Sequence, residues 1–271
     1  MDVIRSRSNE LVQGVRKLAH DAALRRSQGR CVLLGERLIQ DWLALGAVPS
    51  QVLIPQQWLA RPEAQRVLLS WQAQLGGLDR ARSCAWLLLE GTLADGIPGL
   101  VTDAAPIAVA AFHELEDIES LPQDGDILFF DGIQDPGNLG TCLRTAAAFG
   151  VKACIPGPGC ADLWSPKTLR AAMGAHQRLS LWSVRSFESV VERMSGPIRA
   201  ADTHGLAAHE SDLRVPGLWV LGAEGRGLSA TIRQHPRVSL HAIPMQSHTE
   251  SLNAAMAQGI LLYEQYRQRQ L

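Results

Sequence analysis

Residues 127–140 read ILFFDGIQDPGNLG, and this stretch predicts the fold class of the second half of the chain. Ile127 to Phe130 is an all-apolar strand of the kind that is buried on both faces of a parallel sheet. Asn138 is a natural N-cap, so we expect a helix from about Leu139 to Phe149. Val151 to Ile155 then returns as the next strand. Together these elements form a βαβ unit, whose crossover should be right-handed.

The same alternation continues to the C-terminus. Further strands are expected at Leu179 to Val184, Pro197 to Asp202, Leu218 to Leu221 and Ser239 to Ile243. Helices are expected to begin near Ser165-Pro166, Ser186 and Ser229, because Ser is a common N-cap and Pro suits the first helical position. About six strands alternating with helices predict an α/β domain with a parallel sheet. Its ligand site should lie outside the carboxyl ends of the strands.

The first half of the chain also alternates helices with strands. Helices are expected at 9–27, 36–45 and 62–74, and strands at 31–34, 51–54 and 107–112. A run of Gly and Pro residues between 91 and 122 places a domain boundary near Ala105. We therefore predict a smaller α/β domain at 1–105, a linker at 106–123 and a second domain at 124–271.

Residues 243–253 read IPMQSHTESLN and open the last helix. Ser247 and Glu250 have the spacing of a capping box, which predicts that the helix begins there. Apolar residues at helical spacing then predict one buried face: Leu252, Ala255, Met256, Gly259, Ile260, Tyr263 and Tyr266. Ser251 and Asn253 make the first turn polar, as suits a helix N-terminus that binds a polar or anionic ligand. A capped core helix without a ligand is the alternative.

Composition bounds the class of protein. At 271 residues and 46% hydrophobic content the chain can form one large or two ordinary domains. No apolar run is long enough to span a bilayer and Met1 to Asn9 are charged, so a cytoplasmic location without membrane partners is expected. The five cysteines are odd in number and lack CxxC spacing or nearby His pairs. We expect them to be reduced and mostly buried, and we expect no metal site.

Charge is unevenly distributed along the chain. The net charge is only −1, but residues 1–30 carry seven bases and three acids, which is 7 − 3 = +4. This basic arm is either a solvated helix face or an RNA-binding edge. Of the 26 basic residues 23 are Arg, which forms forked contacts with phosphate but is also common in proteins from GC-rich genomes.

Three polar clusters follow strand ends, at 131–144, 222–229 and 243–253. The second cluster reads GAEGRGLS, in which three glycines let backbone approach a ligand closely. Its spacing differs from the dinucleotide-binding GxGxxG, and the chain has no P-loop, GxSxG or HExxH motif.

These clusters resemble, in order, the three motifs of the SpoU family of S-adenosylmethionine-dependent RNA ribose 2'-O-methyltransferases. The matching segments are FFDGIQDPGNLG through Arg144 to Gly150, LGAEGRGLS at 221–229, and IPM through ESLN at 243–253. The resemblance covers about 124–271, and the N-terminal part is more loosely similar to the RNA substrate-binding domain that many members carry. One departure is Ser247, which stands where the family usually has Gly.

The resemblance implies a doubly wound parallel sheet with a trefoil knot, S-adenosylmethionine as cofactor, and a homodimer. It implies cofactor contacts at Gly222, Ile243 and Leu252, with Thr203 as a weaker candidate. Arg144 would lie at the reacting hydroxyl as general base or electrostatic stabiliser, and the groups that position it or the RNA would be Asn138, Glu224, Ser251 and Asn253. Ribosomal RNA is expected as the substrate more than transfer RNA. Two alternatives are a non-catalytic RNA-binding relative, and an ordinary Rossmann methyltransferase with its cofactor beside Asp131.

Overall fold

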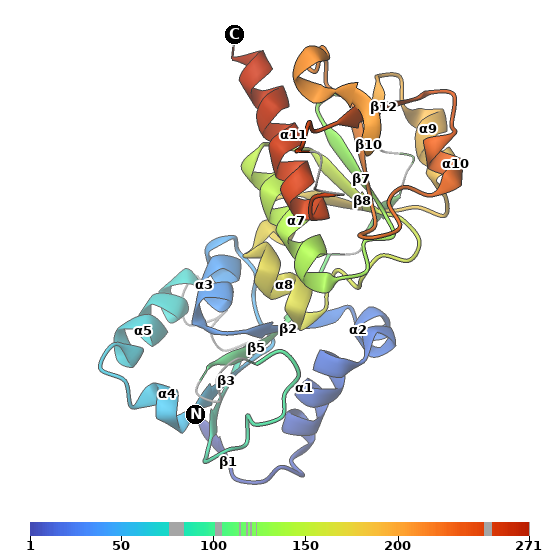
Figure 1. Ribbon diagram of the computed structural model, residues 1–271. Coiled ribbons are helices and arrows are strands. Elements are labelled where there is room, and N and C mark those ends of the chain that lie inside the picture. The colour runs from blue at the N-terminus through green and yellow to red at the C-terminus, as the bar shows by residue number, and fades with distance from the viewer. Residues whose placement is uncertain are drawn as a thin grey trace. The chain divides into compact units, whose positions relative to one another are not determined.

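The chain folds into two units, each built on its own β-sheet (Figure 1). The computed structural model describes residues 1–271 except 76–83, 101–104, 114, 118, 120, 123, 247–250 and 271. One unit comprises Met1–Glu114 and Asp162–Gln177, and the other comprises Leu115–Ala161 and Arg178–Leu271.

The first unit has a mixed sheet in the order β1-β4-β3-β5-β2. Its strands are β1 (Asp2–Ile4), β2 (Arg30–Leu34), β3 (Gln51–Pro55), β4 (Ala85–Leu89) and β5 (Ile107–Ala111). Its helices are α1 (Glu10–His20), α2 (Ala22–Gln28), α3 (Glu36–Ala44), α4 (Gln56–Leu59), α5 (Ala64–Gln74) and α8 (Pro166–Ala172), followed by the 3-10 turn η2 (Ala175–Gln177). Figure 1 shows α1 and α2 on one side of this sheet and α3 to α5 on the other.

Three features of the first unit differ from expectation. The helix expected at 9–27 is interrupted at Asp21, whose carboxylate accepts from the N–H groups of Ala23 at 2.8 Å and Leu24 at 3.0 Å and so starts α2. The stretch 106–123, expected as a linker, contains β5, which is antiparallel to both β2 and β3 in this sheet. Strands β1 and β4 were not predicted.

The second unit has a parallel sheet in the order β12-β10-β11-β7-β8-β9-β6. Its strands are β6 (Glu116–Asp117), β7 (Ile127–Asp131), β8 (Ala153–Pro156), β9 (Ser180–Ser183), β10 (Ile198–Ala207), β11 (Leu218–Gly222) and β12 (Val238–Ala242). All six strands predicted for this half are present, and the doubly wound α/β class is confirmed. The order reverses between β7 and β11, where Gly222 pairs in register with Asp131, so this edge is the expected ligand site of such a sheet.

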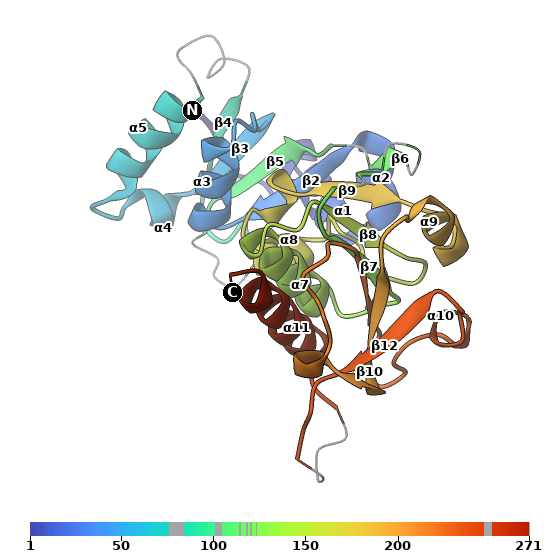
Figure 2. The same cartoon turned by 90° about the horizontal axis from the view of Figure 1, so that it is seen from above.

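Helices cover both faces of the second sheet. They are α7 (Pro136–Ala148), α9 (Phe187–Arg193), α10 (Ala230–Arg233) and α11 (Ala254–Arg269), with the 3-10 turn η3 (Ala208–Glu210). Figure 2 shows α7 and α11 on one face and α9 and α10 on the other. The predicted starts at Ser165, Ser186 and Ser229 are confirmed as N-caps.

The N-cap of α7 is Asp135, so the prediction of Asn138 as the cap was wrong. Asp135 accepts a hydrogen bond from the Asn138 N–H at 2.9 Å, and Pro136 occupies the first helical position. Because the cap lies three residues earlier, the Asn138 side chain is free to bind elsewhere.

Helix α11 also begins at a residue other than the predicted one. Its N-cap is Asn253, whose Oδ1 accepts from the N–H groups of Ala255 and Met256, while Ser247 and Glu250 lie outside the described residues. The predicted buried face was wrong at four of its seven positions, whereas Ala255 is buried and Leu252 and Gly259 are half-buried. Met256, Ile260, Tyr263 and Tyr266 are exposed, and the buried residues are Ala254, Ala255, Gln258, Leu261, Leu262 and Gln265.

Buried glutamines explain why the apolar pattern gave the wrong face. Gln258 Nε2 donates to Cys142 O at 2.8 Å, and Gln265 Nε2 donates to Asp126 Oδ1 at 3.1 Å. Gln265 Oε1 also accepts from the indole of Trp219. Hydrogen bonds to the amide nitrogens of both glutamines favour their burial, although Gln258 Oε1 has no partner among the described residues. Hydrophobic periodicity cannot detect such partners.

Candidate active site

Strand β11 ends in a tight loop whose shape depends on glycine. The Ala223 N–H donates to Gly227 O at 3.1 Å, and the Gly227 N–H donates back to Ala223 O at 2.8 Å. Gly225 and Gly227 have φ values of +75° and +69°, which L side chains rarely adopt. A Cβ on Gly222 would lie 2.5 Å from the carbonyl carbon of Gly227. Gly222 is therefore needed for the loop to fold back on itself, and the loop carries Glu224.

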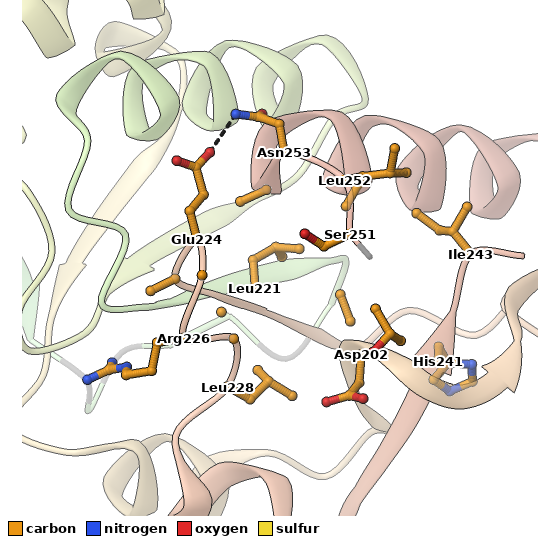
Figure 3. A pocket seen from close by; sticks show the side chains of 18 of the residues that line it. Asp202, Leu221, Glu224, Arg226, Leu228, His241, Ile243, Ser251, Leu252 and Asn253 are labelled. Carbon is orange, nitrogen blue, oxygen red and sulfur yellow. Dashed lines mark hydrogen bonds between the residues drawn. The ribbon is translucent and has the colours of Figure 1, made fainter. Parts of the chain in front are cut away.

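Asn138, Glu224 and Asn253 come from three separate segments and bind one another. Glu224 Oε1 accepts from the Nδ2 atoms of Asn138 and Asn253, each at 2.5 Å. Asn253 Nδ2 also contacts Asn138 Oδ1 at 3.1 Å. Figure 3 shows the bond between Glu224 and Asn253 at the start of α11. We call this trio the amide clamp, and it places one carboxylate beside the N-terminal turns of α7 and α11.

Asp131 joins the end of β7 to the loop after β11. Its Oδ2 accepts from the Ser229 N–H at 2.6 Å, and its Oδ1 lies 3.9 Å from Arg226 Nη2. Asp131 is 8% exposed, and the pocket described next does not include it. Its contacts are those of a structural carboxylate, which does not favour a cofactor seated beside Asp131.

A pocket of about 620 Å³ opens beside the amide clamp, at the carboxyl ends of β10, β11 and β12. All four predicted cofactor residues line it, namely Thr203, Gly222, Ile243 and Leu252. Glu224, Ser251 and Asn253 line it as well, and Asn138 is connected to it through Glu224. The volume falls within the usual range for small-molecule and cofactor sites.

Arg144 lies outside the wall of this pocket. It is exposed on α7, six residues after Asn138, a rise of about 9 Å along the helix. Within the part of the chain that the structure describes, no acid forms an ion pair with Arg144. Its guanidinium is therefore available to a ligand.

Four polar or charged residues that line the pocket were not predicted as site residues: Asp202, Arg226, Arg233 and His241. Asp202 accepts from Arg233 Nη2 at 2.7 Å. Burial raises the pKa of Asp202, but hydrogen bonds from Arg233 and from the His204 N–H outweigh burial and hold the pKa below its usual value. Burial, with Arg199 nearby, lowers the pKa of His241. One signal in the sequence could have indicated Asp202: it is a polar residue at the end of a predicted strand, and the three polar clusters also lie at strand ends.

The cysteines are unpaired. Four are buried and Cys160 is half-buried, and burial raises the pKa of the Cys84 thiol to about 11 and of Cys142 to about 12. Among the described residues, no three His, Cys, Asp or Glu side chains are grouped to hold a metal ion. None of the helices described is both long and apolar enough to cross a membrane.

Comparison with known proteins identifies the second unit. The model of the SpoU rRNA Methylase family matches residues 126–263. The 23S rRNA (guanosine-2'-O-)-methyltransferase RlmB of Pseudomonas aeruginosa is 30% identical, over 86% of this chain and 90% of its own length. The 23S rRNA (guanosine(2553)-2'-O)-methyltransferase RlmP of Bacillus subtilis is 27% identical, over 97% of this chain and 98% of its own.

A solved structure agrees over the full length. The SpoU methyltransferase AviRb from Streptomyces viridochromogenes, in complex with the cofactor AdoMet, superposes with a TM-score of 0.78. It is 25% identical and covers 96% of this chain and 99% of its own. The arrangement of a mixed N-terminal sheet and a doubly wound parallel sheet is thus that of the knotted SpoU methyltransferases.

Proposed function

Because this chain belongs to the SpoU rRNA Methylase family, we propose that it transfers a methyl group from S-adenosylmethionine to a ribose 2'-hydroxyl of ribosomal RNA. The observation that carries this proposal is the amide clamp, which brings residues 138, 224 and 253 together at the edge of one pocket. Ribosomal RNA is proposed over transfer RNA because the names of RlmB and RlmP specify 23S rRNA.

The pocket fits S-adenosylmethionine in size and in chemistry. Gly222, Ile243 and Leu252 form its wall together with Thr203, so backbone groups and apolar side chains surround the ligand. His241 supplies a further reason to expect a polar ligand, because it is 5% exposed and its Nδ1 has no hydrogen-bond partner in the described structure. A buried polar atom without a partner is costly, and a bound ligand could satisfy it.

Arg144 is proposed to act on the reacting hydroxyl. Bound S-adenosylmethionine supplies an electrophilic methyl group, whereas a free hydroxyl is a poor nucleophile. An unpaired guanidinium can donate to the hydroxyl oxygen as negative charge develops there, although a guanidinium gives up a proton only with difficulty. General base and electrostatic stabiliser are both retained as roles for Arg144. The amide clamp and Ser251 would position the ribose and its phosphate.

The proposed reaction is tested by mapping 2'-O-methyl groups in total RNA from cells with and without the gene. One or a few sites in ribosomal RNA should lose the modification and regain it when the gene is restored. Loss only in transfer RNA would refute the proposed substrate. A non-catalytic RNA-binding relative would leave all sites methylated, and calorimetry would find no binding of S-adenosylmethionine.

A homodimer is proposed, with the exposed apolar residues of α11 in its interface. Met256, Ile260 and Tyr263 are 60%, 39% and 58% exposed and recur at helical spacing, an arrangement typical of a surface that a second copy covers. Ile260→Glu should convert the dimer to a monomer in sedimentation velocity. Leu69→Glu is the matched control, since Leu69 is an apolar residue on α5 that is 60% exposed, more than Ile260. A monomeric wild-type protein would refute the proposal.

The remaining parts of the assignment follow from this function. The second unit is proposed to form the methyltransferase domain predicted at 124–271, and the first unit, which includes β5, is proposed to bind the RNA substrate. A cytoplasmic location is proposed because the RNA substrate is found there.

A further inference from the structure

The pocket has two polar ends separated by apolar side chains. Glu224 and Asn253 of the amide clamp form one end, and Asp202 forms the other. Figure 3 shows Asp202 and Glu224 on opposite sides of Leu221. The apolar wall between and around them comprises Leu221, Leu228, Ile243 and Leu252. A ligand that fills the pocket must therefore carry polar groups at both ends.

The carboxylate of Asp202 is held rigidly and keeps free hydrogen-bonding capacity. Its side chain is 5% exposed. Oδ1 accepts from the His204 N–H at 2.9 Å, and Arg233 Nη2 lies 2.7 Å from both oxygens. A carboxylate has about four lone-pair sites, so at least one remains for a ligand. Because an ionised carboxylate only accepts, the ligand group must be a donor.

The two ends differ in charge. Arg233 balances the charge of Asp202, whereas the hydrogen-bond donors to Glu224 are the neutral amides of Asn138 and Asn253. S-Adenosylmethionine is cationic at its sulfonium and its ammonium and anionic at its α-carboxylate, and the two cationic groups are favoured near Glu224. The donors left for Asp202 are the neutral ones on the adenosine part. Ribose hydroxyls suit a buried carboxylate best, since adenine is flat and suits the apolar wall.

We infer that Asp202 is a cofactor-binding residue that accepts a hydrogen bond from a ribose hydroxyl of S-adenosylmethionine, and that Arg233 is the residue that positions it. This inference rests on the proposed function. It adds a contact through a side chain to a site whose other predicted contacts are largely with backbone.

The inference predicts how the pocket distinguishes nucleosides. In competition against S-adenosylhomocysteine on the full-length protein, adenosine should bind more tightly than the analogue that lacks the hydroxyl bound by Asp202, which is either 2'-deoxyadenosine or 3'-deoxyadenosine. The affinity ratio for the hydroxyl that Asp202 binds should be about tenfold or more, as for one hydrogen bond to a charged group. If the wild-type protein binds all three nucleosides equally, the inference is wrong.

Variants separate recognition from a structural role. In Asp202→Asn the amide oxygen can still accept from the His204 N–H, but the second acceptor oxygen is replaced by an NH₂ group. The ratio of the affinities for adenosine and the deoxynucleoside should therefore fall to about one. Arg233→Gln should weaken the binding of all three nucleosides but keep the affinity ratio, since the carboxylate of Asp202 is still present. Asp212→Asn is the matched control, because Asp212 is an exposed carboxylate of the same unit that is paired with Arg214 at 2.9 Å and lies outside the pocket. Asp212→Asn should leave the three nucleoside affinities and their ratio at the wild-type values.

Other outcomes would overturn the inference. If Asp202→Asn weakens the binding of all three nucleosides by the same factor, so that the affinity ratio is unchanged, Asp202 has only a structural role. If methyl transfer to RNA is absent while the Asp202-dependent preference is present, the proposed function fails and the inference stands. If methyl transfer occurs without any preference, the inference alone fails. A wild-type protein that binds no adenosine ligand would overturn both.

Discussion

Arg25 and Arg144 are the same side chain in opposite surroundings. Arg25 in α2 is 3% exposed, donates to Leu18 O and Ala19 O, and pairs with Asp162 at 2.5 Å. Arg144 in α7 is exposed, and no ion pair to it is found among the described residues. Hydrogen bonding and burial therefore commit Arg25 to the fold, whereas Arg144 is available to a ligand. Residue type alone does not distinguish these two uses.

The bases of the basic arm, residues 1–30, likewise divide into paired and exposed side chains. Four of its seven bases are used within the first unit: Arg5 with Glu90, Arg7 with Asp95, Arg16 with the carbonyls of Leu93 and Asp95, and Arg25. The exposed bases that remain are Lys17, Arg26 and Arg30. The surplus of +4 counted along the sequence thus overstates the charge available to RNA.

The largest effect is expected at Arg144. Arg144→Ala should lower the rate of methyl transfer about 10²–10⁴-fold, because a group that stabilises developing charge is removed. Cofactor affinity measured by calorimetry should stay at the wild-type value. Arg214→Ala is the control, since Arg214 is an exposed arginine paired with Asp212. Near-normal turnover in Arg144→Ala would contradict the role given to this side chain.

Arg25 should affect stability instead of activity. Arg25→Met removes a buried guanidinium and leaves the Asp162 carboxylate, which is 17% exposed, without this ion pair, so we expect the free energy of unfolding to fall by about 3 kcal/mol in urea titration. Arg5→Ala provides the comparison, because Arg5 and Glu90 are 74% and 40% exposed and such pairs contribute about 0–1 kcal/mol. Equal losses in the two variants would show that burial does not separate these arginines.

His176 is a buried imidazole that stays neutral in the folded chain at neutral pH. Its Nε2 contacts Leu163 O at 2.9 Å, and burial lowers the pKa of His176 from 6.5 to about 4. The unfolded chain takes up a proton near pH 6.5 that the folded chain takes up only near pH 4. Stability from this group is therefore complete above pH 6.5 and falls by about 3 kcal/mol as pH drops to 4.

The pH effect is measured by urea titration between pH 7 and pH 4. His176→Gln should remove this part of the pH dependence, and His20→Gln, at an exposed position, should retain it. A wild-type slope that is unchanged in His176→Gln would refute the assignment.

The smallest effect is expected from the exposed bases of the arm. Lys17→Ala combined with Arg26→Ala should weaken RNA binding several-fold, with a slope of log affinity against log salt reduced by about 1–2. The free energy of unfolding should not change, because neither side chain is buried. Arg66→Ala, on α5, is the control in the same unit. Unchanged RNA affinity and salt slope in the double variant would identify the arm as a solvated helix face.

Much of the candidate site could be predicted because its residues lie in short segments at strand ends. Gly222, Glu224, Ile243 and Leu252 were assigned from motifs, and the structure places them around one pocket. Asp202 was missed because its partner Arg233 lies 31 residues away, on the short helix α10. A carboxylate at the end of a strand gives no indication in sequence that it is buried.

The sequence by itself determined the alternation of strands and helices, the Ser N-caps of α8, α9 and α10, and the order of the three motifs. These depend on local periodicity and, at Ser165 and Ser186, on cap hydrogen bonds within one turn. Only the tertiary structure decided that the side chains of Asn138 and Asn253 meet at Glu224, and which face of α11 is buried. It also decided which arginines are unpaired. Each of these depends on partners distant in sequence, as in the bond between Asn138 and Asn253 across 115 residues.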